Sequence, residues 1–243
     1  MQSWGLTDPG CVRQQNQDAY RIEQLDRHTL LCVVCDGMGG AKSGNVASAL
    51  AAEVFAEEVR RSWTSGMTSD RIDQMLRSAV KLANFTVFDQ AAQFEEFSGM
   101  GTTLVAALIQ EKRITLVNVG DSRAYGMDRN GIHLLTKDHS LVQMMVDRGD
   151  LTPEVAKSYP GKNLITRAIG TEPTVMCDIY HKEVNKGDFL LLCSDGLSNV
   201  MDDQEILFEV VHGVNKQHCC QRLLSIAKNR GAPDNVTSVL VLI

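Results

Sequence analysis

Four aspartates stand beside apolar segments that have the length of buried strands. They are Asp36, Asp121 and Asp195, which follow Leu30 to Cys35, Ile114 to Val119 and Phe189 to Cys193, and Asp234, which precedes Val236 to Ile243. Strand ends meet at the rims of sheets, so this placement predicts that the four carboxylates converge at one rim. The recurrence of the pattern is more informative than any one of its members.

Carboxylates held this close repel one another and raise each other's pKa unless a cation neutralises them. The candidate ligands are oxygens, and no His or Cys cluster has the spacing of a zinc site, so hard ions such as Mg²⁺ or Mn²⁺ fit better. Gly37 and Gly196 allow the backbone to turn sharply and expose a carbonyl oxygen as a further ligand. Each Asp-Gly pair taken alone is more simply a turn, and only the recurrence favours a metal site.

The segment Arg13-Gln14-Gln15-Asn16-Gln17-Asp18 adds a fifth carboxylate and a guanidinium near the N-terminus. A guanidinium can contact two phosphate oxygens at once, so Arg13 is a candidate phosphate-binding residue. On its own the segment would be an ordinary polar loop. Its interest comes from the carboxylates elsewhere in the chain.

The elements that must position these residues follow from the apolar periodicity. Helical spacing predicts two long amphipathic helices, in Val46 to Phe55 and Ile72 to Val87, each covering a sheet face. Further helices are expected at Ser140 to Arg148, Asp203 to His212 and Gln217 to Asn229, and strands at Phe189 to Cys193 and Val236 to Ile243. Short strands and the dipeptide Asn130-Gly131 predict an antiparallel meander between Thr103 and Thr136. Strands clustered in runs indicate an α+β fold, with antiparallel sheet packed between helices.

Composition narrows the class of protein. The 243 residues are 44% apolar, carry a formal net charge of −6 and contain no linker-like stretch, so we expect one domain over residues 1–243. The absence of a basic stripe argues against nucleic acid as a partner. Residues Met1 to Leu6 lack the features of a signal peptide, and no segment has the length of a membrane helix. We therefore expect a cytoplasmic protein without a membrane partner.

The seven cysteines are odd in number and mostly lie in apolar runs, which favours reduced thiols. Cys32 and Cys35 form a Cys-x-x-Cys pattern. Residues three apart in a strand face opposite ways, which argues against a redox or zinc site there.

Six short motifs follow one another between residues 13 and 237. They are Arg13 with Asn16 and Asp18, Asp36-Gly37-Met38-Gly39-Gly40, Gly101-Thr102-Thr103, Gly120-Asp121-Ser122-Arg123, Ser194-Asp195-Gly196-Leu197, and Asp234-Asn235-Val236-Thr237. Their order resembles that of the metal-dependent protein phosphatases, the type 2C or PPM family, and in particular of its bacterial members. The resemblance implies a β-sandwich flanked by α-helices on both sides (α-β-β-α), with metals in a cleft at one end of the sheets.

The resemblance also implies the activity, which is hydrolysis of phosphoserine and phosphothreonine on proteins at two Mn²⁺ or Mg²⁺ ions. Carried over by position, Asp36 bridges the two ions, the Gly37 carbonyl and Asp18 bind the first side, and Asp195 and Asp234 bind the second. Arg13 would hold the substrate phosphate, and Asp121 matches the position of a weaker third metal. Two ions that share a water can lower its pKa to near neutrality and direct it at phosphorus, so no protein nucleophile is required.

The segment at about 139–170 resembles the mobile flap of bacterial relatives, which lies beside the cleft and helps choose substrates. The implied partners are phosphorylated proteins, including a Ser/Thr protein kinase whose work the enzyme reverses. We expect the chain to be a monomer.

The motif around Asp36 departs from that of many bacterial relatives, because this chain has Ala41 and Asn45 where they have His and Glu. Outer-shell partners alter metal affinity ~10 to 100-fold, so these positions bear on how tightly metal binds. Met38 stands where eukaryotic relatives have a His proposed as general acid. The remaining proton donors are a water on a third metal at Asp121, which we favour, and His139 in the flap.

Two other functions compete with this prediction. One is a non-catalytic binding module that keeps the fold and uses the cleft only for recognition, and the intact aspartate set argues against it. The other is a metal-dependent hydrolase of small phosphoesters or a nuclease, and the acidic net charge disfavours the nuclease.

Overall fold

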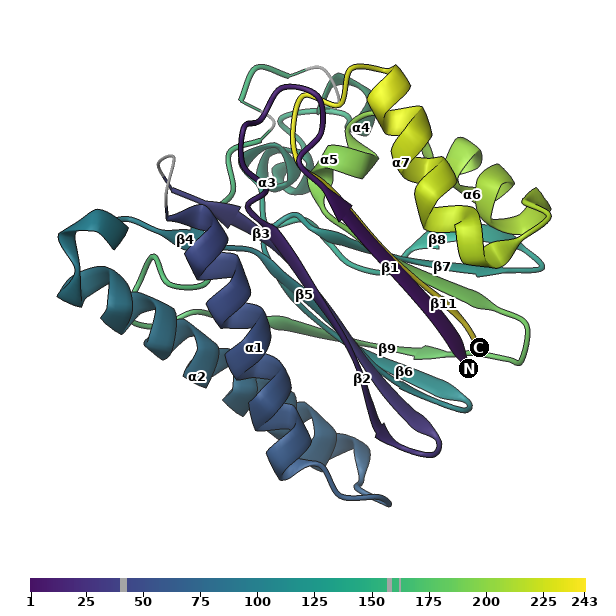
Figure 1. The fold of residues 1–243 in the computed structure, drawn as a ribbon, viewed down its shortest axis with the longest axis horizontal. Helices are drawn as coiled ribbons and strands as arrows, with labels where there is room; N and C mark the ends of the chain where they lie inside the picture. Colours follow the sequence, from purple (N-terminus) through teal and green to yellow (C-terminus); the bar gives the residue numbers. More distant parts are fainter. Residues whose placement is uncertain (40–42, 157–158, 162) are drawn as a thin grey trace.

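Two antiparallel sheets pack face to face between two layers of helices in the computed structural model, which describes residues 1–39, 43–156, 159–161 and 163–243 (Figure 1). The first sheet has the strand order β1-β11-β10-β7-β8, and the second has the order β2-β3-β5-β6-β9 with β4 paired to β3. Figure 1 shows α1 and α2 on one side of this sandwich and α6 and α7 on the other. The α+β fold with helices on both sides, expected from the sequence, is confirmed.

The first sheet contains β1, β7, β8, β10 and β11, and the second contains the strands from β2 to β6 together with β9. Their bounds are β1 Gln2–Asp8, β2 Asp18–Asp26, β3 Thr29–Met38, β4 Gly101–Thr102, β5 Leu104–Gln110, β6 Arg113–Val119, β7 Arg123–Asp128, β8 Gly131–Leu134, β9 Asp178–Glu183, β10 Phe189–Cys193 and β11 Val236–Leu242. The helices are α1 Gly44–Ser62, α2 Ser69–Gln93, α3 Leu141–Arg148, α4 Pro153–Ala156, α5 Asp195–Ser198, α6 Asp203–His212 and α7 Cys219–Asn229, with short 3-10 turns at Glu95–Phe97 and Lys216–His218.

Strand β3 is apolar along almost its whole length because both of its faces are buried. Leu31, Val33 and Cys35 face the layer of α1 and α2, whereas Cys32 and its alternating neighbours face the other sheet. The two cysteines of the Cys-x-x-Cys pattern therefore lie in different cores, as the strand period predicts. All seven cysteines are among the described residues and are free thiols.

Helices α1 and α2 form where the sequence predicts two amphipathic helices, and they cover the sheet that contains β2 and β3 (Figure 1). Small residues such as Ala47 and Ala51 face the sheet and allow the α1 backbone to approach it closely, with Phe55 filling the space further along. The opposite sheet is covered by α5, α6 and α7, whose core includes Ile206 and Leu223. Each sheet thus has one face on the other sheet and one face on helices.

The antiparallel meander predicted between Thr103 and Thr136 is wrong in one respect. Strands β5 and β6 pair within one sheet, and β7 and β8 pair within the other. The chain crosses between the sheets at Gly120, whose φ of +105° is open only to glycine at low cost. The hairpin near Asn130-Gly131 is present, with Asp128 paired to Gly131 across the turn.

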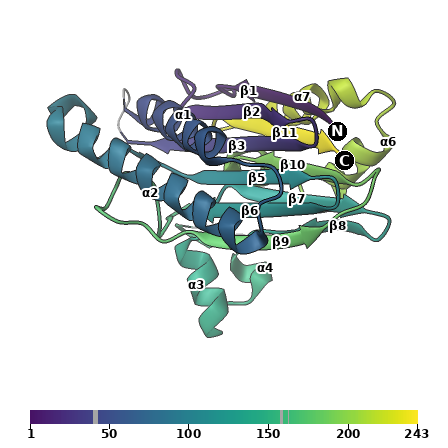
Figure 2. The same cartoon turned by 90° about the horizontal axis from the view of Figure 1, so that it is seen from below.

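Helices α3 and α4 stand off the sandwich beside β9 (Figure 2). Ser140 caps α3, since its side chain accepts a hydrogen bond from the backbone N–H of Gln143, and Gly149 ends the helix in the left-handed region. Neither α3 nor α4 has a buried residue. These helices fall within the predicted flap at about 139–170, of which residues 157, 158 and 162 lie outside the described residues.

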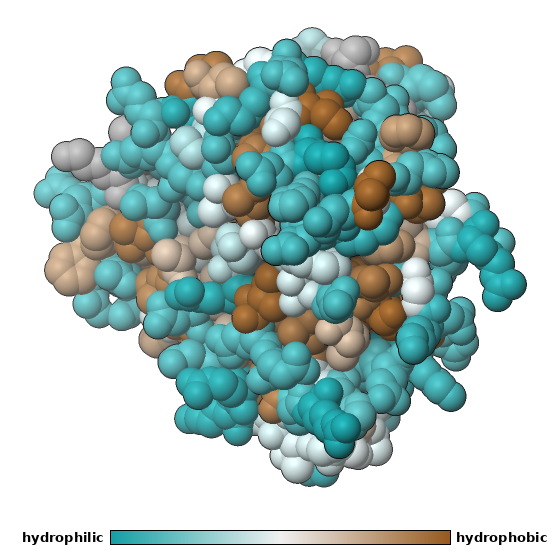
Figure 3. Space-filling view, turned by 45° about the vertical axis from the view of Figure 1, so that its right-hand side comes forward, coloured by the Kyte–Doolittle hydropathy of each residue, from teal (hydrophilic) through white to brown (hydrophobic). Residues whose placement is uncertain are grey.

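In the part of the chain that the structure describes, no helix combines the length and the apolar content needed to cross a membrane. On the face seen in Figure 3, apolar residues are interspersed with polar ones.

Candidate active site

Asp18 and Asp36 lie opposite each other on β2 and β3, at the same end of the second sheet. Side chains directly opposite in an antiparallel pair share a face and have Cβ atoms about 4.5–5.5 Å apart. The register therefore brings these two carboxylates together. Asp18 is buried, with 8% of its surface exposed.

Asp195 and Asp234 reach the same end from the first sheet. Strands β10 and β11 are antiparallel neighbours, with Cys193 paired to Ser238, so the end of β10 meets the start of β11. Asp195 is the first residue of α5, directly after Ser194, and Asp234 comes two residues before β11. Four aspartates separated by up to 216 positions in the sequence thus lie close enough at one rim for their charges to act on one another.

Two hydroxyls from the first sheet connect the sheets at Asp18. Ser194 Oγ and Thr237 Oγ1 donate to the same Asp18 oxygen, Oδ2, at 2.7 and 2.6 Å. The other oxygen, Oδ1, is buried and has no hydrogen-bond partner among the described residues. A buried carboxylate oxygen without a partner is costly, so a group that satisfies it would stabilise the site.

The aspartates of the cluster have raised pKa values because they are buried near one another's negative charge. Burial first, and then the charges of Asp195 and Asp234, raise the pKa of Asp18 to about 7, against the hydroxyl bonds that lower it. Burial and four neighbouring carboxylates, Asp18 foremost, raise the pKa of Asp36 well above its usual range. Burial and the charge of Asp234 also raise the pKa of Asp195.

Asp121 joins the cluster from the crossing between β6 and β7. Burial and the nearby charges of Asp195 and Asp138 raise its pKa to about 7. Its neighbour Ser122 is fully buried, and the Ser122 hydroxyl lies 2.7 Å from Thr103 Oγ1. Thr103 Oγ1 also accepts from the Asp36 N–H, and the Thr103 N–H donates to the Asp36 carbonyl, both at 2.9 Å. The corner that carries Asp121 is thereby tied to Asp36.

Arg13 lies beside Asp234, and its guanidinium is paired with that carboxylate. Nε and Nη2 donate to the two oxygens of Asp234 at 2.9 and 2.8 Å, a bidentate pair in which both side chains are partly exposed. The hydrogen bond and charge of Asp234 raise the pKa of Arg13, and Asp36 and Asp195 contribute further. Arg13 thus supplies positive charge to the carboxylate cluster.

Gly37 is needed at its position for a different reason from the expected sharp turn. It lies inside β3, and a Cβ atom built on it would be 2.0 Å from the Gly44 carbonyl oxygen and 2.6 Å from the Gln17 carbonyl oxygen. The sequence-based interpretation of Gly37 as a turn residue is therefore wrong, because the glycine is required by the close approach of the start of α1. Gly40 and Ala41 of the same motif lie outside the described residues.

The carboxylate oxygens of the cluster are ligands that hard cations prefer. The side chains, however, do not surround a single point at ligand distance. Within the described residues, no three His, Cys, Asp or Glu side chains are already grouped as ligands of one ion. Like charges that lack a cation repel one another, and the Arg13 guanidinium occupies the Asp234 oxygens, which accounts for the spread. Asp18 Oδ1, which has no partner within the residues that the structure describes, and the raised pKa values fit a site that binds positive charge.

His139, the alternative proton donor, is not free to serve a leaving group. It is buried, with 6% of its surface exposed, and both ring nitrogens have partners in Gly120 and Asp178. Its position argues for a role in holding the structure around Asp121.

Several residues of the site have roles that could not be read from the sequence. The hydroxyls of Thr103, Ser194 and Thr237 hold the aspartates, and Asn235 Oδ1 accepts from the Gln17 N–H at 2.8 Å. The signal that could have found most of them is their place inside the six short motifs, next to the aspartates. Arg123, in the same motif as Asp121, forms a bidentate pair with Asp138.

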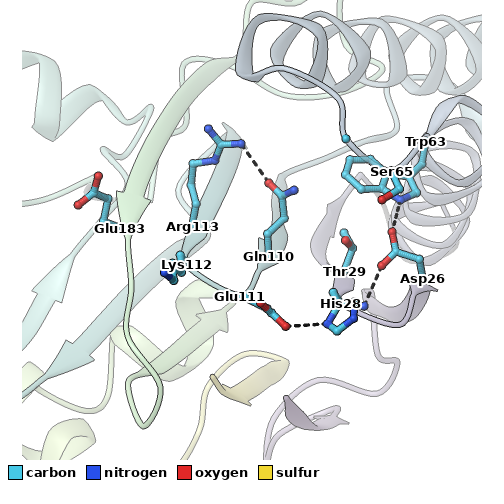
Figure 4. Close-up of a pocket in the computed structure, with 11 residues that line it drawn as sticks. Asp26, His28, Thr29, Trp63, Ser65, Gln110, Glu111, Lys112, Arg113 and Glu183 are labelled. Atoms are coloured by element: carbon cyan, nitrogen blue, oxygen red, sulfur yellow. Dashed lines mark hydrogen bonds and ion pairs between the residues drawn. The ribbon is translucent and has the colours of Figure 1, made fainter.

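The large cavity in Figure 4 is at the other end of the sandwich. It has a volume of about 510 Å³ and is lined by the β2–β3 and β5–β6 hairpins and the α1–α2 connection. In the register of β2 and β3, Asp26 and Thr29 form the last pair and Asp18 and Asp36 the first. Its charged groups also pair with one another, as His28 does with Glu111 at 2.7 Å. This cavity is therefore separate from the aspartate cluster.

A helix-flanked β-sandwich with a rim of buried carboxylates defines a class of metal-dependent hydrolase, and the comparisons with known proteins identify the family. The sequence profile of Protein phosphatase 2C matches residues 12–226. The serine/threonine phosphatase stp of Listeria welshimeri is 33% identical over 235 residues, covering 97% of this chain and 93% of that protein. Protein phosphatase PhpP of Streptococcus pneumoniae is 33% identical over 238 residues, covering 97% and 95%.

The solved structures agree. The serine/threonine phosphatase Stp1 of Staphylococcus aureus superposes with a TM-score of 0.92 at 36% identity, covering 99% of this chain and 94% of that one. The chain belongs to the protein phosphatase 2C family and is a metal-dependent enzyme of its serine/threonine phosphatase class.

Proposed function

We propose that this chain hydrolyses phosphoserine and phosphothreonine on proteins at a centre of two Mn²⁺ or Mg²⁺ ions. The proposed ligands are Asp18, Asp36, the Gly37 carbonyl, Asp195 and Asp234, with Asp121 holding a weaker third ion. The observation that carries the proposal is the buried Oδ1 of Asp18, which has no hydrogen-bond partner in the described part of the chain and lies within a cluster of carboxylates of raised pKa. A pair of divalent ions would satisfy that oxygen and remove the repulsion.

When bound, the ions supply Lewis acidity and an acidified water nucleophile, so no side chain needs to attack phosphorus. The chain's own residues orient the ligands. Ser194 and Thr237 hold Oδ2 of Asp18 and so direct Oδ1 toward the centre of the cluster, while Thr103 fixes the backbone of Asp36 through two hydrogen bonds. Fixed groups of this kind need no reorganisation during reaction.

Arg13 is proposed to bind the substrate phosphate. Its fork already makes a bidentate contact with a carboxylate, and a phosphate offers two oxygens of similar spacing. A cation held by Asp234 would neutralise that carboxylate, and the Arg13 guanidinium would then be available to contact the substrate phosphate. Arg13 therefore exchanges one anionic partner for another.

The proposal includes the setting of the enzyme. The family and the names of its relatives support phosphorylated proteins as substrates, and a Ser/Thr protein kinase is the proposed opposing partner. We further propose a cytoplasmic monomer in which residues 1–243 form one catalytic domain, with the segment at about 139–170 acting as its flap.

The test is release of inorganic phosphate from a phosphothreonine peptide with added Mn²⁺. Asp36→Asn and Asp234→Asn are expected to lose most activity while keeping the circular dichroism spectrum of the wild type, and excess chelator is expected to abolish turnover. Asp70→Asn, which alters an exposed carboxylate on α2, is the matched control and should remain active. Full turnover in excess chelator would refute the metal mechanism. Tight phosphopeptide binding without phosphate release would instead favour the non-catalytic binding module.

A further inference from the structure

His139 forms hydrogen bonds with both the N–H and the carbonyl group of Gly120, the residue before Asp121. The Gly120 N–H donates to His139 Nδ1 at 3.1 Å, and the His139 N–H donates to the Gly120 carbonyl at 2.9 Å. Asn118, which is fully buried, donates from Nδ2 to the same carbonyl at 3.2 Å. Three hydrogen bonds therefore fix the backbone at the point where the chain crosses between the sheets.

The Gly120 backbone is restricted by its own conformation and by its close contact with Thr103. Its φ is +105°, and a Cβ atom built on it would lie 2.6–2.7 Å from the Thr103 side chain. Thr103 in turn binds the backbone of Asp36 and the hydroxyl of Ser122. A displacement of Gly120 would therefore move Thr103 and, through it, both Asp36 and Ser122.

The far side of the His139 ring is held by Asp178. Nε2 lies 3.2 Å from Asp178 Oδ2 and also 3.2 Å from Arg167 Nη1, and this Nη1 donates to Asp178 Oδ1 at 3.0 Å. The Tyr180 hydroxyl also donates to Oδ2, at 3.3 Å. Burial and then the charge of Arg167 lower the pKa of His139, against the opposing pull of Asp178. A neutral ring whose Nδ1 accepts from Gly120 must carry its proton on Nε2, so Nε2 donates to Asp178.

The same cluster joins the two ends of the segment at about 139–170. The Thr166 N–H donates to the His139 carbonyl at 2.7 Å, and Arg167 is the next residue along the chain. His139, at the start of this segment, is thus hydrogen-bonded both to the end of the segment at Thr166 and to Gly120, the residue before Asp121.

We propose that His139 is a positioning residue whose ring, oriented by Asp178, holds Gly120 and so fixes the Asp121 carboxylate within the aspartate cluster. The inference deepens the proposed function, on which it rests for the role of Asp121. It assigns His139 no contact with substrate and no proton transfer.

Two variants distinguish the contact of Nδ1 with Gly120 from the contact of Nε2 with Asp178. In His139→Asn the side-chain oxygen can occupy the position of Nδ1 and accept from Gly120, but it cannot reach Asp178. In His139→Gln the amide can occupy the position of Nε2 and reach Asp178, but it leaves the Gly120 N–H unpaired. His133→Gln, which changes a partly exposed histidine on β8, is the matched control.

The first readout needs neither metal nor substrate. Amide hydrogen exchange at Gly120 and Asp121, followed by NMR, is expected to speed up about 10-fold or more in His139→Gln and to change less than about 3-fold in His139→Asn. The second readout is calorimetric titration with Mn²⁺. His139→Gln should weaken the weaker class of Mn²⁺ sites about 10-fold, the lower end of the range for outer-shell partners, and leave the tighter class within about 2-fold.

A double mutant tests whether His139 acts through Asp121. If it does, His139→Gln should change phosphopeptide kcat in the wild type and have no further effect in an Asp121→Ala background. Asp178→Ala alters a partly exposed side chain and keeps the test available if His139→Gln does not fold. It should loosen Gly120 by an amount between those of the two histidine variants.

Equal effects of His139→Asn and His139→Gln, or Gly120 exchange unchanged in both His139→Gln and Asp178→Ala, would overturn the positioning role. Additive losses in the double mutant would do so as well. A wild type that releases no phosphate while its exchange and Mn²⁺ titrations behave as stated would refute the proposed function and leave the positioning role intact.

Discussion

Arg13→Ala is expected to move the affinities for metal and for phosphate in opposite directions. The Arg13 guanidinium donates to both oxygens of Asp234, at 2.9 and 2.8 Å. A metal ion that uses Asp234 must displace this contact, whereas a phosphate gains from the released guanidinium. The variant therefore removes a competitor of the metal and a partner of the phosphate.

The size of the metal effect follows from exposure. The side chains of Arg13 and Asp234 are 55% and 36% exposed, so the pair belongs with surface ion pairs, which contribute about 0.2–1 kcal/mol. Its loss should tighten Mn²⁺ binding by roughly 1.4- to 5-fold. A charged hydrogen bond to phosphate contributes about 1.5–3 kcal/mol, so the inhibition constant for phosphate should rise by roughly 10- to 150-fold.

The assay is a pair of titrations. Calorimetry with Mn²⁺ in phosphate-free buffer gives the metal affinity, and inhibition of p-nitrophenyl phosphate hydrolysis at saturating Mn²⁺ gives the phosphate affinity. Arg13→Lys keeps the positive charge but not the planar fork, so it should bind Mn²⁺ within about 2-fold of the wild type and lose much of the phosphate affinity. Lys228→Ala removes a cation that pairs with Asp8 rather than with the cluster, and both affinities should be unchanged.

Weaker Mn²⁺ binding by Arg13→Ala would refute the competition between guanidinium and metal at Asp234. Unchanged phosphate inhibition would refute Arg13 as the phosphate-binding residue. Equal gains in Mn²⁺ affinity in Arg13→Ala and Arg13→Lys would show that the fork, and not the charge, opposes the metal.

Two further predictions concern the aspartates. Asp18 has a folded pKa of about 7 against its ordinary 3.8, so the stability it contributes is present in full below about pH 4 and is lost as the pH rises through 7. In excess chelator, Asp18→Asn should therefore match the wild-type Tm near pH 4 and exceed it increasingly as the pH rises toward 7, and a difference that does not change with pH would contradict the raised pKa. Asp121→Ala at saturating Mn²⁺ should slow a phosphoserine peptide much more than p-nitrophenyl phosphate, because an alkoxide needs proton donation that the aryl ester barely requires. Equal slowing of both substrates would remove Asp121 from proton donation.

Local pattern was enough to predict most elements of the fold. The long helices, α6 and the strands β10 and β11 follow from apolar runs of helical or strand period, and α6 begins and ends at the predicted residues. Strands β1, β2 and β9 were not predicted, because they are partly exposed and mix polar with apolar residues. The division of the predicted meander between two sheets depends on the crossing at Gly120, and no periodicity carries that information.

The sequence by itself determined which residues meet. The aspartates lie next to strands that end at one rim. The pairing of those strands then places the aspartates close together. Only the tertiary structure decided what holds them. Ser194 and Thr237 reach Asp18 across 176 and 219 positions, Arg13 reaches Asp234 across 221, and the ring of His139 joins Gly120 to Asp178. Such contacts depend on the packing of two sheets and on side-chain geometry, which are non-local, whereas propensity and periodicity describe only neighbours along the chain.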